Sequence, residues 1–128
     1  MDALTICAAN YLPFAKVLAS SFIRTHPNSK FYILLVDGDV CEIELDLLPG
    51  MEVIKPSDLD IDHETFVRMT VYYDVTELST ALKPKGLKYL LDNGSDIAIY
   101  IDPDIQVFSE LTEIKEHLVA SNIALTPH

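Results

Sequence analysis

Two aspartates flanking a proline, Asp102-Pro103-Asp104, are the residues of this chain best suited to chemistry. They directly follow residues 97–101, an apolar run typical of a buried strand. In an extended chain, residues i and i+2 face the same way, roughly 6.5–7 Å apart, and proline keeps the preceding residue extended. Because Mg²⁺ and Mn²⁺ prefer oxygen ligands, the pair predicts a divalent metal site. The alternative, a proline turn carrying two solvated acids, stays open.

Further polar candidates follow the first two predicted strands, at residues 4–8 and 31–36. Asn10 and Tyr11 come after the first strand, and Asp37 ends the second. In open parallel sheets, ligands bind beyond the carboxyl ends of the strands. Asn10 and Tyr11 are therefore candidates for contact with a nucleotide base, and Asp37 for a base or sugar. Simple packing of the tyrosine and a turn at the aspartate are the structural alternatives.

A lysine within a helical pattern is a candidate phosphate ligand. Asp74 and Glu77 form a capping box that predicts the start of a helix, and Gly94 is a stop signal. Pro84 interrupts this pattern and predicts a kink or break, from which Lys83 could reach a phosphate. An ordinary surface lysine is the alternative.

Strands alternate with helices along the chain, which predicts an α/β fold with a parallel sheet. The expected helices open near Pro13, at Asp74 and near Thr112. The expected strands are 4–8, 31–36, 51–54, 97–101 and 123–125. The sequence of 128 residues reads as one domain, and its end directly after the fifth predicted strand suggests the front part of a longer protein.

Composition narrows the classes of function. The net charge of −11 argues against nucleic-acid binding, and no apolar run approaches the ~18 residues of a membrane span. Cys7 and Cys41 form no zinc or disulfide pattern, and the opening residues resemble no signal peptide. We therefore expect a reduced, cytoplasmic protein, with peripheral membrane association also open. His26, His63 and His117 are expected at the surface.

The residues 99–105 resemble the strand and DxD motif of GT-A glycosyltransferases. Residues 76–84 are similar to a segment of bacterial nucleotide-sugar transferases related to family 8, and residues 7–12 give a third, weaker similarity. The order and spacing of the three segments agree across nearly the whole chain. The resemblance implies a Rossmann-like GT-A fold of three α/β/α layers. Residues 1–128 would be the donor-binding part of that fold.

The resemblance also implies roles for individual residues. Asp102 and Asp104 would carry Mn²⁺ or Mg²⁺, with Asp102 also near the ribose. Lys83 would contact the donor, and Asp37 would lie near the base. The loop that cradles the base would comprise Ala8, Ala9, Asn10 and Tyr11. The implied donor is a nucleotide-sugar, foremost a UDP-sugar, and the implied activity is of the hexosyltransferase type.

GT-A catalytic domains are about twice the length of this chain, so the acceptor site and any further metal ligand map to no residue here. The acceptor, whether glycan, lipid or protein, stays unidentified, and self-association through exposed apolar surface is an expectation. Two other functions stay open: a non-catalytic nucleotide-binding or structural module, and a receiver-type signalling domain. The second lacks the acidic pair that should follow the first strand, where Ala8-Ala9-Asn10 stand instead.

Overall fold

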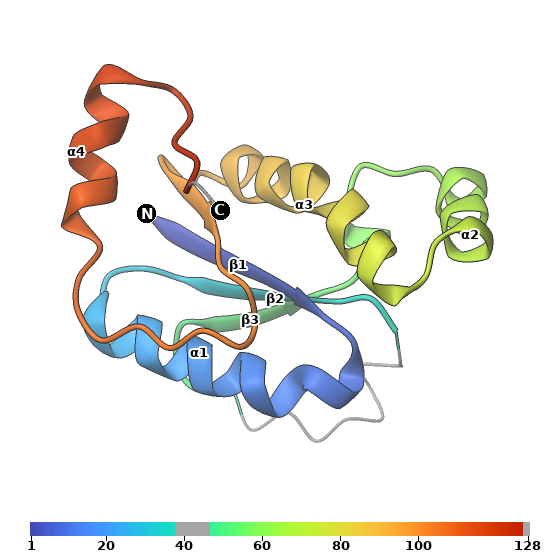
Figure 1. Ribbon diagram of the computed structural model, residues 1–128, viewed down its shortest axis with the longest axis horizontal. Helices are drawn as coiled ribbons and strands as arrows, with labels where there is room; N and C mark the ends of the chain where they lie inside the picture. Colours follow the sequence, from blue (N-terminus) through green and yellow to red (C-terminus); the bar gives the residue numbers. More distant parts are fainter. Residues whose placement is uncertain (38–46, 127–128) are drawn as a thin grey trace.

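The computed structural model describes residues 1–37 and 47–126 (Figure 1). Cys41 and His128 therefore lie outside the described residues. The strands are β1 (Asp2–Cys7), β2 (Phe31–Leu35), β3 (Met51–Ile54) and β4 (Ala98–Tyr100). The helices are α1 (Leu12–Thr25), α2 (His63–Tyr72), α3 (Val75–Asp92) and α4 (Thr112–Ala120), with short 3₁₀ turns η1 (Ala9–Tyr11) and η2 (Pro56–Asp58).

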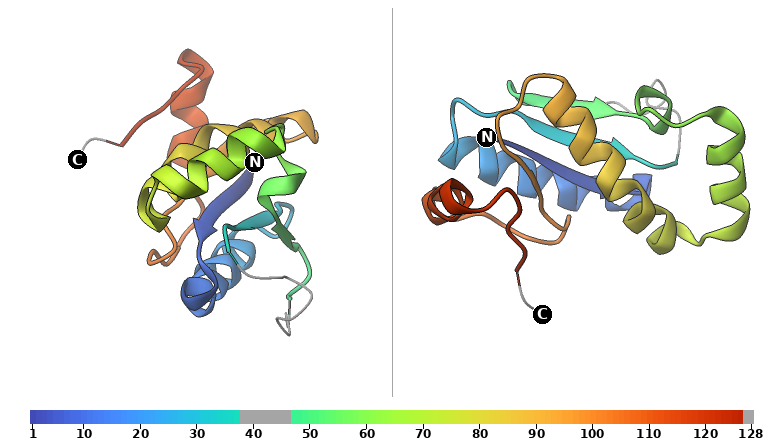
Figure 2. Two further views of the ribbon diagram at one scale, coloured as in Figure 1. Left: turned by 90° about the vertical axis from the view of Figure 1, so that its right-hand side faces the viewer. Right: turned by 90° about the horizontal axis from the view of Figure 1, so that it is seen from above.

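The four strands form one parallel sheet in the order β3-β2-β1-β4. Helix α1 covers one face and α3 covers the other, which gives the three layers expected from the sequence (Figures 1 and 2). β1 is flanked by β2 and β4, as in dinucleotide-binding folds. Receiver-type domains have the order 2-1-3-4-5, so this topology is inconsistent with the receiver alternative.

The alternation of side chains along β1 divides the core in two. Ala3 and Cys7 face α1, whereas Leu4 and Ile6 face α3. Both sets are buried, because parallel strands covered by helices on both sides have no solvent face. β1 is therefore the central element against which both helical layers are positioned.

Gly86 lets α3 lie close against β1. A Cβ atom built on this glycine would stand 2.6 Å from Leu4 Cδ2, closer than carbon atoms can pack. Leu82 and Leu90, one turn on either side, are fully buried on the sheet. This close packing fixes the height of α3 above the sheet, and with it the position of Lys83.

Two elements differ from expectation. The break allowed for at Pro84 does not occur: α3 continues through this residue as one helix, because burial of its apolar face outweighs the hydrogen bond that the proline cannot make. Residues 123–125 form no strand, and the side chains of Ile123 and Leu125 are 75% and 87% exposed. Within the described residues they pair with no other strand, so an extended backbone would form no inter-strand hydrogen bonds here.

The position of one histidine also differs from expectation. His63 and His117 are exposed, as predicted, but His26 is buried directly after α1. Its ring stacks on Phe22, and its two nitrogens make hydrogen bonds. The local sequence around His26 carries no information about this packing, because the Leu111 partner lies far away in the chain. Within the described residues, no helix has the length and apolar character that crossing a bilayer requires.

Thr5 offers a test of the central strand. Its side chain is fully buried, and its Oγ1 has no hydrogen-bond partner in the described structure. We predict that Thr5→Val, which keeps the shape and removes the hydroxyl, raises the free energy of unfolding by about 1 kcal/mol. Denaturant unfolding measures this change. The matched control Thr80→Val, at an exposed site of α3, should alter stability by less than about 0.5 kcal/mol. A destabilised Thr5→Val variant would contradict the prediction.

Candidate functional site

The candidate site lies where the order of strands reverses. From β1 the chain builds the sheet outward through β2 and β3 on one side, and later adds β4 on the other. At such a switch point the connections leave the carboxyl ends of the two central strands in opposite directions, which opens a crevice. The residues that follow β1 and β4 leave the sheet at this point, and those that follow β2 lie beside them.

The segment after β1 is fixed by the end of β2. Ala8 is buried and precedes the 3₁₀ turn η1, on which Ala9, Asn10 and Tyr11 lie. The backbone N–H of Ala9 donates to Asp37 Oδ1 at 2.6 Å. Asp37 therefore holds the loop after β1 in place. Asn10 and Tyr11 are exposed, so their side chains are accessible to a ligand.

The segment after β4 is a turn. The N–H of Ile105 donates to the carbonyl of Asp102 at 3.1 Å, which closes a four-residue turn with Pro103 second. Proline favours that position because its fixed φ suits the first central residue of a turn. The expectation of an extended Asp102-Pro103-Asp104 is therefore wrong. The turn leaves both aspartate side chains exposed.

Lys83 reaches the end of β4 from α3. Its Nζ lies 3.6 Å from Asp102 Oδ1 and 4.0 Å from the centroid of the Tyr100 ring. The side chain of Lys83 is half-buried, whereas that of Asp102 is mostly exposed. The fold therefore brings together the two residues that the sequence had placed at separate candidate positions. Tyr100 joins them and was missed as a site residue, although its position two residues before Asp102 is the signal that points to it.

Acidic groups dominate the electrostatics of the site. Burial, then the negative charge and hydrogen bond of Asp102, raise the pKa of Tyr100 well above its usual range; Cys7 and Asp104 add to this. Burial and the charge of Asp37 raise the pKa of Cys7 to about 11. Both groups are therefore protonated and neutral at physiological pH. Lys83 is the cation that the fold places beside Asp102.

The possible metal ligands of the candidate site can be compared with those that a divalent ion requires. Within residues 1–37 and 47–126, no cluster of three His, Cys, Asp or Glu side chains could enclose a metal. Mg²⁺ and Mn²⁺ bound with a substrate commonly take only one or two carboxylates, with water and phosphate oxygens completing the shell. Two exposed aspartates in one tight turn fit that open type of site. They do not fit a closed metal site made by protein alone.

Two solved structures resemble the chain, and both are of the galactosyltransferase LgtC. One is an active-site mutant, with a TM-score of 0.58 and 20% sequence identity. The other is a complex with donor and acceptor sugar analogues, with a TM-score of 0.56 and 19% identity. No family model and no curated protein matches the sequence.

Each match covers 89% of this chain and 41% of the LgtC chain. The chain thus spans less than half the length of the structures it resembles. The shared part contains the parallel sheet with its two covering helical layers, which confirms the fold expected from the sequence. The chain therefore has the α/β fold of GT-A glycosyltransferases and spans part of that fold.

Proposed function

We propose that this chain is the donor-binding part of a metal-dependent glycosyltransferase that uses a nucleotide-diphospho-sugar, foremost a UDP-sugar. The observation that carries the proposal is the ion pair of Lys83 with Asp102 at the switch point of the sheet. Similarity in fold to LgtC, a galactosyltransferase, supports it. The sugar acceptor would bind in a part of the protein that this chain does not include.

The proposed roles follow from the chemistry of each side chain. Asp102 and Asp104 would hold Mn²⁺ or Mg²⁺, with Asp102 also close to the ribose. A bound divalent ion supplies charge that stabilises the departing diphosphate. Lys83 would then exchange its contact with Asp102 for one with a phosphate oxygen, since a charged amine on a long stem can serve either anion.

The remaining residues would position the nucleoside. Asn10 and Tyr11 are exposed on η1 and would contact the base, while Ala8 and Ala9 provide backbone close to it. Asp37 would act mainly by holding the Ala9 amide, which keeps this loop in place without the ligand. A preformed loop lowers the conformational entropy lost on binding.

A charge-matched pair of variants tests the metal site. We predict that Asp104→Asn weakens binding of UDP in the presence of Mn²⁺ by about tenfold or more, since a charged carboxylate ligand becomes a neutral amide. The control Asp96→Asn makes the same charge change at an exposed position before β4, at the opposite end of the sheet, and should leave binding unchanged. Titration calorimetry on the chain, with Mn²⁺ and with EDTA, measures both. Equal affinity with and without metal would contradict the metal assignment.

Lys83 is tested by removing its charge. We predict that Lys83→Met, which keeps the length of the side chain, lowers affinity for UDP about tenfold and has a much smaller effect on uridine, which has no phosphate. The control Lys88→Met removes a charge from an exposed position on the same helix, where the lysine pairs with Asp92. Calorimetry with UDP and with uridine distinguishes a lysine that binds phosphate from one that affects binding in general. Equal losses for UDP and uridine would show that Lys83 is not a phosphate ligand.

A second function is favoured by one observation. The chain spans 41% of the LgtC chains, so a module that binds a nucleotide without catalysing transfer is a separate candidate. Such a module would bind UDP as above but hydrolyse no UDP-sugar. Metal-dependent release of UDP from a UDP-sugar, followed by chromatography, distinguishes the two.

A further inference from the structure

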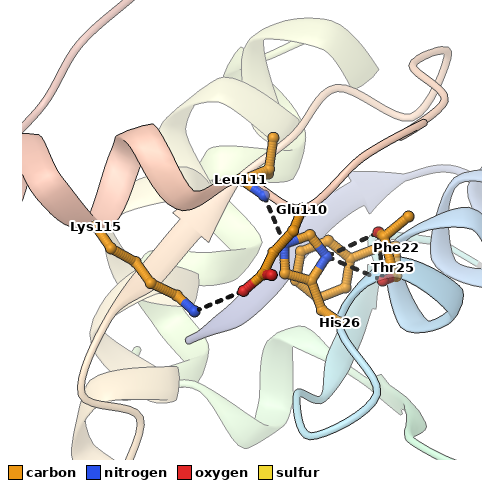
Figure 3. Close-up of polar contacts among 6 residues, drawn as sticks. All are labelled: Phe22, Thr25, His26, Glu110, Leu111 and Lys115. Atoms are coloured by element: carbon orange, nitrogen blue, oxygen red, sulfur yellow. Dashed lines mark hydrogen bonds and ion pairs between the residues drawn. The ribbon is translucent and has the colours of Figure 1, made fainter.

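The segment that follows the Asp102 turn is attached to α1 by two hydrogen bonds. The N–H of Val107 donates to Ser21 Oγ at 2.9 Å, and the N–H of Leu111 donates to His26 Nε2, also at 2.9 Å. The first bond is buried and the second is partly buried. Together they hold the stretch that leads from the candidate site to α4 against the C-terminal end of α1. Figure 3 shows the bond between Leu111 and His26.

The bonds to His26 define its protonation state. Its ring is 4% exposed and stacks on Phe22, with centroids 4.3 Å apart and planes 9° from parallel. Nδ1 lies 2.8 Å from Thr25 Oγ1 and 3.1 Å from the Phe22 carbonyl oxygen. Because Nε2 accepts the proton of the Leu111 amide, it carries none of its own. The ring is therefore the neutral form with its proton on Nδ1, which donates to one of those two oxygens.

Protonation would disrupt this arrangement. A second proton on the His26 ring would sit on Nε2 and face the N–H of Leu111, so that two donors would oppose each other. The positive charge would also be buried. No carboxylate of the described residues forms an ion pair with this ring that would offset the cost of burying the charge.

The charged groups on the elements around His26 do not change this conclusion. On α1, Arg24 is exposed and its charge opposes protonation. Glu110 would favour protonation, but its carboxylate pairs with Lys115 Nζ at 3.3 Å (Figure 3). After the helix, Lys30 pairs with a glutamate of β3 at 2.7 Å.

We propose that His26 is a pH-sensitive clasp: neutral, it holds the segment 105–111 on α1, and protonated, it releases that segment. The clasp depends on the contacts of His26 alone and stands whether or not the chain binds a nucleotide. Val107, buried in the core cluster on the α1 face, would lose its cover when the clasp opens. Release would also free the polypeptide directly after Asp104.

The direction of the pH effect follows from the protonation state in which His26 can bind the Leu111 amide. Only neutral imidazole accepts the bond from the Leu111 amide, so the closed clasp is favoured at high pH and loses stability as the pH falls. The released form gains a proton that the closed form excludes. At pH 5 the population of the open form should rise about 30-fold over its value at pH 8, by proton linkage.

Amide hydrogen exchange on the full chain tests the clasp. After correction for the intrinsic pH dependence of exchange, protection of the Leu111 and Val107 amides should fall about 30-fold between pH 8 and pH 5. Amides of β1 report global stability and should change much less. Constant protection of Leu111 across this range would overturn the proposal.

Variants separate the titration of His26 from its packing. His26→Gln retains an acceptor that does not titrate, so protection of Leu111 should no longer depend on pH. His26→Phe retains the stacking but removes the acceptor, and should leave Leu111 weakly protected at every pH. The control His117→Gln removes an exposed histidine of α4 and should behave as the unmodified chain. An unchanged pH dependence in His26→Gln would refute the clasp.

A spectroscopic measurement needs no variant. Nitrogen-15 spectra of the histidine rings should show Nε2 of His26 unprotonated and hydrogen-bonded at pH 8. Loss of that signal should coincide with loss of Leu111 protection. A ring already protonated on Nε2 at pH 8 would contradict the assignment made from the structure.

Discussion

Burial of β1 on both faces is the constraint on which the rest of the structure depends. Its side chains point alternately into the cores beneath α1 and α3, and its backbone pairs with β2 and β4. The strand order reverses beside it, and the candidate site lies at its carboxyl end. The candidate site residues Ala8, Lys83 and Asp102 come from three separate regions of the chain, and each is positioned relative to this one strand.

The acidic character of the chain gives the Lys83 contact its significance. A net charge of −11 repels a diphosphate, so binding requires local positive charge. The fold supplies one lysine, held by a carboxylate and by the face of Tyr100. A divalent ion on the aspartates of the turn would supply the remainder. This is why the proposed function depends on a metal, and why a lysine at this position alone would be insufficient.

Helix α1 has two structural roles. Its start follows η1, which carries candidate site residues. Near its C-terminal end, Ser21 and the following His26 bind the segment after Asp104. Segments on both sides of the switch point are thus attached to the same helix. The apolar face of α1 packs on the sheet, while these two polar side chains at its C-terminal end are buried against the outgoing polypeptide. A helix that covers a sheet therefore also organises the loops at the sheet edge.

The sequence by itself determined the parallel α/β fold, the capping of α3 and the position of the Asp102-Pro103-Asp104 motif after a strand. These follow from local patterns: continuous apolar runs, a capping box and the fixed φ of proline. Only the tertiary structure decided that Lys83 meets Asp102, that His26 is buried, and that residues 123–125 form no strand. Each of these depends on which distant segment packs against the residue. Ion pairing, burial of a polar ring and strand pairing all require partners far away in the chain, and local composition does not specify them.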